Sequence, residues 1–263
     1  RVSVCDGKLL TEEKDIWYSK TAVNPQILSS PKPTTFQHYL VQNSHGEKKL
    51  KHYDSKNTEP RGHKLYWHQP DKTPFEANQS EVKEHATQYT QICPLKSGVK
   101  FRFKIHFDNL FDYELGALCW ALQPNGESGK EYCHKLGMAK PLGLGSVKLT
   151  PKLTIVNRKQ RYKSLNGLGE NHDTSLDAYI AAFEKTFLTM DGRSERFADK
   201  ERIKELLKMM EFPGTVHQNK VYLDKHSIFK ADKLKIYRER RILPKPTDVE
   251  KIQPAKKTQN NRR

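Results

Sequence analysis

A short basic stretch, His134–Lys148 (HKLGMAKPLGLGSVK), combines a flexible backbone with positive charge. Its residues with the chemistry to hold a phosphate chain are Lys135, Gly137, Lys140, Gly143 and Gly145. Glycine lets a backbone approach phosphates closely, and lysine supplies the opposite charge. The spacing is not that of a P-loop, and we expect a strand rather than a helix to follow, which excludes the common nucleotide-binding loops. A tight turn with left-handed glycines is the simpler alternative.

A second group of basic and aromatic residues lies in the segment RGHKLYWHQP. Its members are Arg61, His63, Lys64, Tyr66, Trp67 and His68. An aromatic ring beside basic side chains can stack a nucleic-acid base for ~1–3 kcal/mol. Tyr66 can equally anchor the core, and for Trp67 we favour the core because tryptophan is usually well buried.

The charge of the whole chain points to a polyanionic partner. The 263 residues carry a formal net charge of +16, with a pI near 9.6 and a mean hydropathy of −0.86. Nucleic acid is the partner that such basicity favours, although ribosomal and membrane-surface proteins share it. The length suits one large domain or a domain with an extension.

Cysteine usage and apolar run lengths restrict the class further. The cysteines Cys5, Cys93, Cys119 and Cys133 lie far apart and form no C-x-x-C pair. This spacing signals neither a zinc ribbon nor a redox pair, and it favours a reducing, intracellular setting. No apolar run approaches ~20 residues, so we expect no membrane span. The chain begins at Arg1 rather than Met, and we expect it to be a piece of a longer protein.

The elements around the glycine-lysine stretch begin with a strand at Val99–Phe107 (VKFRFKIHF). Its apolar positions are Val99, Phe101, Phe103, Ile105 and Phe107, and its basic positions are Lys100, Arg102, Lys104 and His106. Side chains alternate across a strand, so this pattern predicts one apolar and one cationic face. The cationic face is either simply solvated or lies near phosphates.

A helix, a loop and a strand are predicted next. Asp112 can cap a helix whose apolar positions include Leu115, Cys119 and Leu122, and 124–126 (PNG) ends it. The glycine-lysine loop follows, and extended structure then begins at Val147. Strand, helix, loop and strand make up half of a ferredoxin-like or RRM-like unit.

The remainder of the chain is predicted to be helical and then basic. One amphipathic helix carries Leu176, Tyr179, Ile180, Phe183 and Phe187, and a second carries Ile203, Leu206, Leu207 and Met210. We expect both apolar stripes to pack in a core. From Lys230 onward the chain is rich in Lys, Arg and Pro, which predicts an extended or partly disordered tail.

Together these segments resemble the RAMP superfamily, the RNA-binding proteins of CRISPR-Cas systems. The family's helix of the form L-x-x-x-E-L-G-x-L is matched by Leu110, Glu114, Leu115, Gly116 and Leu118. Its G-x-G-K-x-x-G-x-G-like loop is matched by Gly137, Lys140, Gly143 and Gly145, with Ala139 where a glycine is common. SSPKPTTFQHYL and RGHKLYWHQP also resemble segments of type III backbone subunits. The likeness covers Leu28–Leu149 and is greatest to the last RAMP unit of giant single-chain type III-E effectors.

The resemblance implies an α+β protein with a ferredoxin-like (RRM-like) RAMP fold, insertions and a helical, basic C-terminal extension. The implied domains are an RNA-binding RAMP domain at 1–160 and the extension with its basic tail at 161–263. The implied function is to bind guide RNA (crRNA) as a backbone module of a type III effector. The implied partners are crRNA, single-stranded target RNA, other RAMP units and a caspase-like peptidase, in the cytoplasm of a prokaryote, with no membrane.

The residues expected to contact RNA fall into two ranks. The first rank is the loop itself, Lys135, Lys140 and the backbone of Gly137, Gly143 and Gly145. The second rank comprises Lys32, Thr34, Gln37, Arg61, His63, Lys64 and Tyr66.

We expect this segment to bind RNA rather than to cut it. Metal-dependent cleavage needs clustered carboxylates, but Asp112 and Glu114 suit a helix start and Asp108 suits a turn. No cofactor is expected from this segment, although the full effector can use a divalent metal for target cleavage. The alternative is a metal-independent RAMP endoribonuclease that processes repeat RNA through a histidine, for which His38, His63, His68 and His134 are candidates. A third hypothesis is an interaction module whose C-terminal helices dock a protein partner.

Overall fold

The structure is a computed structural model, and it describes residues 1–27, 36–42, 50–62, 65–69, 75–163, 171–192, 196–213, 242 and 244–251. The chain divides into two units built from separate stretches. The first unit comprises Arg1–Val23, Gln91–His134 and Val147–Leu207, and the second comprises Asn24–Thr90, Lys135–Ser146 and Lys208–Arg263. The expected boundary at residue 160 stays a prediction.

Helices and small antiparallel sheets are mixed along the chain, as expected of the α+β class. The strands are β1 (Val2–Val4), β2 (Lys8–Leu9), β3 (Phe101–Arg102), β4 (Ile105–Phe107), β5 (Glu131–Tyr132), β6 (His134–Lys135), β7 (Ser146–Val147), β8 (Leu153–Val156), β9 (Asn171–Thr174) and β10 (Glu211–Phe212). The α-helices are α1 (Phe36–Tyr39), α2 (Gln79–Glu84), α3 (Asp112–Leu122), α4 (Arg158–Arg161), α5 (Asp177–Asp191) and α6 (Glu201–Met210). The 3-10 helices are η1 (Glu13–Asp15), η3 (Ala86–Gln88), η4 (Lys140–Leu142), η5 (Phe197–Asp199) and η7 (Pro246–Lys251).

The N-cap of helix α3 is Phe111, one residue earlier than the sequence predicts. Asp112 is its first helical residue and not its cap, so the capping prediction is wrong. Glu114, in the first turn, stabilises the helix start instead, because its Oε2 accepts a hydrogen bond of 2.8 Å from the backbone N–H of Phe111. The same carboxylate pairs with Arg1. A carboxylate in the first turn also suits the positive end of the helix dipole, and the helix ends at Leu122 as predicted.

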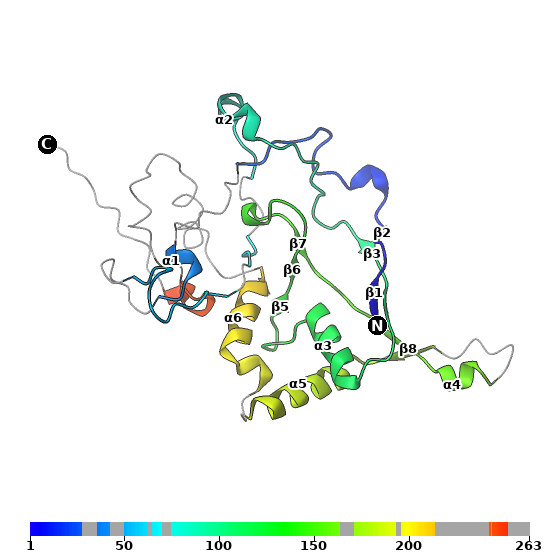
Figure 1. The fold of residues 1–263 in the computed structure, drawn as a ribbon. Coiled ribbons are helices and arrows are strands. Elements are labelled where there is room, and N and C mark those ends of the chain that lie inside the picture. The colour runs from blue at the N-terminus through cyan, green and yellow to red at the C-terminus, as the bar shows by residue number, and fades with distance from the viewer. Residues whose placement is uncertain are drawn as a thin grey trace. The chain divides into compact units, whose positions relative to one another are not determined.

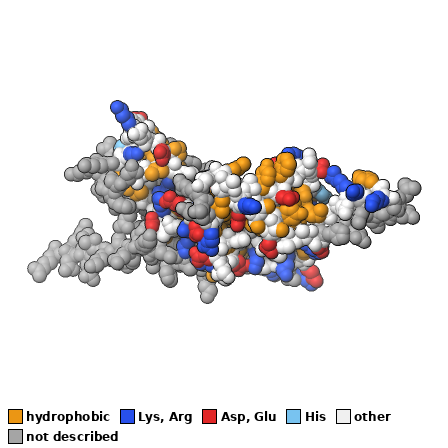
Figure 2. Space-filling view, turned by 90° about the horizontal axis from the view of Figure 1, so that it is seen from below, with side chains coloured by type: hydrophobic (Ala, Val, Ile, Leu, Met, Phe, Trp, Pro, Cys, Tyr) orange, Lys and Arg blue, Asp and Glu red, His pale blue; other side chains and the backbone are white. Residues whose placement is uncertain are grey.

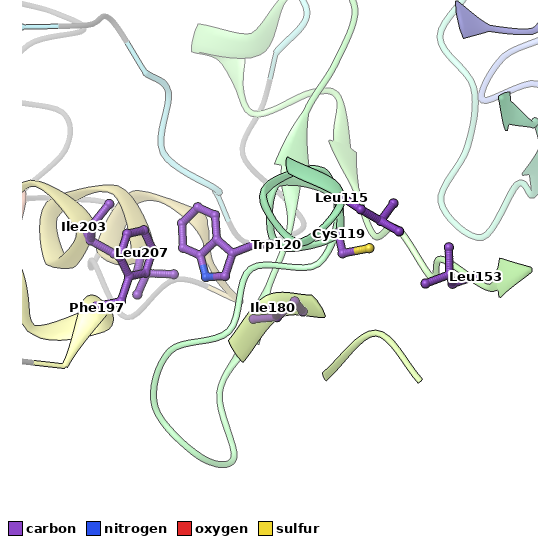
Figure 3. Close-up of a cluster of buried hydrophobic side chains, with 8 residues drawn as sticks. All are labelled: Leu115, Cys119, Trp120, Leu153, Ile180, Phe197, Ile203 and Leu207. Atoms are coloured by element: carbon purple, nitrogen blue, oxygen red, sulfur yellow. The ribbon is translucent and has the colours of Figure 1, made fainter. Parts of the chain in front are cut away.

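The core of the first unit lies where α3 meets α5, η5 and α6. Its buried members are Leu115, Cys119, Trp120, Leu153, Ile180, Phe197, Ile203 and Leu207 (Figure 3). The ring of Trp120 stands edge-on to Phe197, with ring centroids 5.2 Å apart. Tyr179, Phe183 and Phe187 of α5 pack against this cluster, which confirms that the apolar stripes of both C-terminal helices are core. Burial of such side chains contributes ~1.5–3 kcal/mol each.

A glycine makes the close approach of α3 and α5 possible (Figure 1). A Cβ placed on Gly116 would lie 1.9 Å from the carbonyl oxygen of Tyr179 and 2.9 Å from the Cβ of Phe183. Both distances are shorter than any real contact, so only glycine fits at this position. The ELGAL segment therefore has a packing role in the fold.

A two-stranded ribbon joins the N-terminus to the predicted strand. β1 pairs antiparallel with β4, so that Val2 faces Phe107 and Val4 faces Ile105, and β2 pairs with β3. The strand at Val99–Phe107 is thus divided into two short pieces. The expected alternation of burial holds at Ile105–Phe107 but not at Phe101 and Phe103, which are 50% and 40% exposed.

Smaller elements complete the two units. In the first unit, β8 and β9 form an antiparallel pair that matches Leu153 with Thr174 and Val156 with Asn171. In the second unit, Asn78 caps α2 by accepting a hydrogen bond of 2.8 Å from the N–H of Glu81. The predicted tail from Lys230 falls largely outside the described residues. None of the helices that the structure describes is long and apolar enough to cross a membrane.

Candidate nucleic-acid interface

The glycine-lysine loop between β6 and β7 belongs to the second unit and is closed by backbone hydrogen bonds. The N–H of Leu136 donates to the carbonyl of Gly145 over 2.8 Å, at the base of the loop. Within it, the N–H of Leu142 donates to Ala139 over 2.9 Å, and the N–H of Gly143 donates to Lys140 over 3.1 Å. The middle of the loop is therefore a short 3-10 turn, η4, and the Leu136–Gly145 hydrogen bond closes the loop at its base.

Four residues of this loop adopt left-handed backbone conformations. The φ angles are 86° at Gly137, 54° at Ala139, 96° at Gly143 and 75° at Gly145. The glycines are thus required for the path of the chain, as the turn interpretation expects. Ala139, at the position where the RAMP pattern commonly has a glycine, is held at φ 54° and ψ 26°, a conformation that costs an L-residue ~1–2 kcal/mol.

Gly143 and Gly145 are also needed for space. A Cβ on Gly145 would lie 1.9 Å from the carbonyl oxygen of Leu136, and a Cβ on Gly143 would lie 3.1 Å from the side chain of Gln69. Nothing lies within 4 Å of the corresponding point at Gly137. The space beside the Cα of Gly137 is therefore open at the tip of the loop.

Both lysines of the loop turn toward its own carbonyl oxygens. Lys135 Nζ donates to the carbonyls of Gly143 and Leu144, each over 3.1 Å, and Lys140 Nζ donates to the carbonyl of Gly137 over 2.7 Å. Burial lowers the pKa of Lys135 to about 8, because a low-dielectric setting disfavours the ammonium. A lysine has three N–H donors, so Lys140 keeps two for other acceptors and Lys135 keeps one.

The tip of the loop presents backbone N–H groups and two apolar side chains. Leu136 and Met138 are 69% and 67% exposed. Within the part of the chain that the structure describes, no hydrogen bond uses the N–H groups of Gly137, Met138 and Ala139. Left-handed residues next to such free N–H groups are typical of the concave backbone sites, called nests, that bind anions.

The RGHKLYWHQP segment lies against the loop within the second unit. His68 Nδ1 lies 2.8 Å from Ser146 Oγ, and Gln69 Nε2 donates to the carbonyl of Pro141 over 3.0 Å. His68 is 3% exposed, and its ring stands edge-on to Phe212. The structure thus brings together two segments that the sequence separates by about seventy positions. Leu142, fully buried, anchors the loop from the inside.

The remaining predicted contacts have different fates. Gln37, in α1, is fully buried, and we leave it out of the interface. Arg61 donates to the backbone carbonyl of Pro244. Tyr66 and Trp67 are half-buried, so Trp67 is less buried than a core position requires. The predictions for Lys32, Thr34, His63 and Lys64 lie outside the described residues.

Four of the groups considered for cleavage have structural partners. His134 Nε2 donates to the carbonyl of Leu122 over 3.1 Å, and His68 is buried against Ser146. Asp108 pairs with Arg158 over 2.5 Å, and Glu114 pairs with Arg1. Among the described residues no group of three or more His, Cys, Asp or Glu side chains is placed to hold a metal ion.

The surface of the protein mixes apolar groups with positive charge. Figure 2 shows exposed apolar side chains in groups, with Lys and Arg side chains beside them. In the first unit, Val4, Phe101 and Phe103 are among the large apolar side chains left exposed. Such groups, beside cations, are typical of surfaces that face a partner.

Comparison with known proteins gives no independent assignment. No protein-family model matches the chain, and no curated protein matches it.

Proposed function

We propose that this chain binds guide RNA as a backbone module of a type III CRISPR RNA-targeting effector. It would hold guide and target RNA while the assembled complex cuts the target. The observation that carries the proposal is the loop of Gly137–Gly145, which combines left-handed residues, free backbone N–H groups and Lys140 at its tip, with Lys135 at its base. The net charge of +16 supports a polyanionic ligand.

The order of elements in the first unit supports a ferredoxin-like RAMP core. Along the chain, strands β3 and β4 are followed by α3, then by the short strands β5 to β7, then by the antiparallel pair β8 and β9 with α4 between its strands, and then by α5. A ferredoxin-like unit also runs from strand to helix to two strands to helix, whereas the strands described here pair in separate two-stranded sheets. The two helices of that succession, α3 and α5, pack against each other at Gly116.

The loop would bind RNA mainly through its backbone. Phosphate oxygens accept hydrogen bonds from free N–H groups, and the N–H groups of Gly137, Met138 and Ala139 are placed for this. Lys140 would add positive charge, and its Nζ could donate to phosphate the N–H groups that do not bond the Gly137 carbonyl. Lys135 would act chiefly by holding the carbonyls of Gly143 and Leu144, which fixes the shape of the nest.

The same proposal makes the chain a binding module rather than a nuclease. Cleavage of target RNA, with a divalent metal where the effector uses one, would take place on other RAMP units. Two of the histidines considered for metal-independent cutting have structural partners, His68 beside Ser146 and His134 at the carbonyl of Leu122, which weighs against their use in repeat processing. Other RAMP units, target RNA and a caspase-like peptidase are the proposed partners.

Guide-RNA binding as a function of salt tests the proposal. The variants are Lys140→Gln and the double Lys135→Gln/Lys140→Gln, with Lys148→Gln as a control that removes one charge just beyond the loop, where Lys148 pairs with Glu131. Each lost phosphate contact removes roughly 0.7 from the slope of log K against log salt on a single strand. The double variant should lower the slope by about 1.4 at most, and the control should leave it unchanged.

An unchanged slope in the double variant would remove the loop lysines from the interface. Incubation of the guide with the chain alone, with and without magnesium, completes the test. We expect no cleavage products. A product ladder that disappears when one histidine is changed would favour the endoribonuclease instead.

A further inference from the structure

The ribbon of β1–β4 carries a row of cations on the face opposite its apolar side chains. Register pairs Lys8 with Arg102, and pairs Leu9 with Phe101. Directly paired residues of an antiparallel ladder share a face, and neighbours along a strand alternate between faces. Lys8 and Arg102 therefore lie on one side, and Leu9 and Phe101 on the other.

The row continues along the second strand. The N–H of Leu10 donates to the carbonyl of Lys100, and the N–H of Cys5 donates to the carbonyl of Lys104, each over 2.9 Å, so pairing extends beyond the regular strands. Alternation along β3 places Lys100 with Arg102 on one face, about 6.8 Å apart. Lys104 and His106 follow at the same spacing in the sequence, beyond a one-residue change of register between β3 and β4. All four are exposed, as is Lys8.

No acid neutralises this row among the residues that the structure describes. Lys8, Lys100, Arg102 and Lys104 make no ion pair and no side-chain hydrogen bond there. The nearby carboxylates have other partners: Asp108 pairs with Arg158, Glu12 with Lys14 and Glu114 with Arg1. Asp6, at the bend between β1 and β2, is the one exposed acid within the ribbon's own sequence.

We propose that this cationic ribbon face is a binding site for the phosphate backbone of single-stranded RNA, separate from the glycine-lysine loop. A row of like charges at strand spacing fits a chain of phosphates about one nucleotide apart. A membrane surface fits less well, because an interfacial element buries its apolar face in the membrane, which would turn the cationic face of this ribbon away from the lipid. Here the exposed Val4, Phe101 and Phe103 project from the opposite face. The site lies in the first unit and does not rest on the function proposed for the loop.

The test compares charge-neutral variants of the full chain. The ribbon variant is Lys100→Gln/Arg102→Gln/Lys104→Gln. The matched control, Lys20→Gln/Lys159→Gln/Lys185→Gln, removes the same charge from scattered exposed positions of the same unit. Binding of a labelled uridine 20-mer is measured over a salt series. We expect the ribbon variant to lower the salt slope by about 2, from three contacts of roughly 0.7 each, and the control to lower it by less than 0.7.

A conservative variant separates charge from fold. Lys100→Arg/Arg102→Lys/Lys104→Arg keeps every charge, and it should bind the uridine 20-mer like the unchanged chain. An unchanged slope in the ribbon variant, or an equal loss in the matched control, would overturn the proposal. So would a ribbon variant that keeps RNA binding but no longer sediments with phosphatidylserine vesicles. If the loop variant binds RNA normally and the ribbon variant does not, the function proposed for the loop is refuted and the ribbon site stands.

Discussion

His68 Nδ1 and Ser146 Oγ lie 2.8 Å apart, and this contact ties the RGHKLYWHQP segment to the end of the glycine-lysine loop. The histidine is buried and the serine is exposed. A partly buried hydrogen bond of this kind contributes about 1 kcal/mol net, and a buried group that loses its partner costs ~1–3 kcal/mol. The pair therefore holds the loop in place rather than serving as a reactive dyad.

The first prediction concerns that pair. His68→Ala should destabilise the fold by ~2–3 kcal/mol, since it removes the hydrogen bond and leaves a cavity beside Phe212. Ser146→Ala should cost less, about 1 kcal/mol. Urea denaturation of both single variants and the double variant should give a coupling energy of about 1 kcal/mol. Strict additivity would contradict a direct interaction.

The second prediction concerns Gly116. Alanine is the better helix former by ~1 kcal/mol, so propensity alone predicts that Gly116→Ala stabilises α3. The contact with the carbonyl of Tyr179 reverses the sign, because the added Cβ would lie 1.9 Å from that oxygen. We expect a net loss of ~1–3 kcal/mol in urea denaturation, typical of overpacking. Ala121→Gly, at an exposed position of the same helix, is the control and should cost about 1 kcal/mol from propensity alone. A stabilising Gly116→Ala would mean that the two helices are not packed this closely.

The third prediction uses two neighbours of the loop tip with opposite expected signs. Ala139→Gly relieves ~1–2 kcal/mol of left-handed strain and pays ~0.5–1 kcal/mol of backbone entropy, so it should be neutral or slightly stabilising. Gly137→Ala introduces the same strain at φ 86°, where there is space but no favourable conformation, and should cost ~1–2 kcal/mol. Thermal or urea melts of the two variants check the difference. Equal effects would indicate that the tip does not hold this backbone path.

The fourth prediction is a pH dependence of stability at Lys135. Its folded-state pKa is lowered from 10.5 to about 8 by burial. Between these values the unfolded chain binds more protons than the folded chain, so the free energy of unfolding rises with pH across this window. Lys135→Met should flatten that rise when urea denaturation is repeated from pH 7 to pH 10. Lys20→Met, at an exposed lysine, controls for the lost charge and should keep the rise.

Much of the helical core was predictable from the sequence, because it depends on local periodicity. The stripe from Leu176 to Phe187 and the stripe around Ile203 became buried surfaces, as did Cys119. Period 3.6 spacing survives in almost any context that buries one face of a helix. The class of the fold followed from the same patterns, whereas the ferredoxin-like arrangement stays a prediction.

The sequence predicted which types of residue form the candidate site, but it did not predict which groups those residues contact. The left-handed glycines followed from composition, but the turn of Lys135 toward Gly143 depends on how the loop closes. The contact of His68 with Ser146 is non-local, and no pattern within either segment announces it. At the helix start, Asp112 was predicted as the cap and Glu114 as a first-turn residue, and the structure places Phe111 at the cap with its N–H bonded to Glu114.

The fifth prediction joins the pKa of Lys135 to RNA binding. A phosphate near the ammonium favours its charged form, so RNA bound at the loop should raise a pKa that burial has lowered to about 8. Near pH 8.5, guide binding should therefore take up protons, and the amount should vanish in Lys135→Met but persist in Lys140→Gln. Calorimetry in two buffers of different ionisation enthalpy measures the uptake directly. Binding without proton uptake would mean that the phosphates stay away from Lys135, which would then serve only to hold the carbonyls of Gly143 and Leu144.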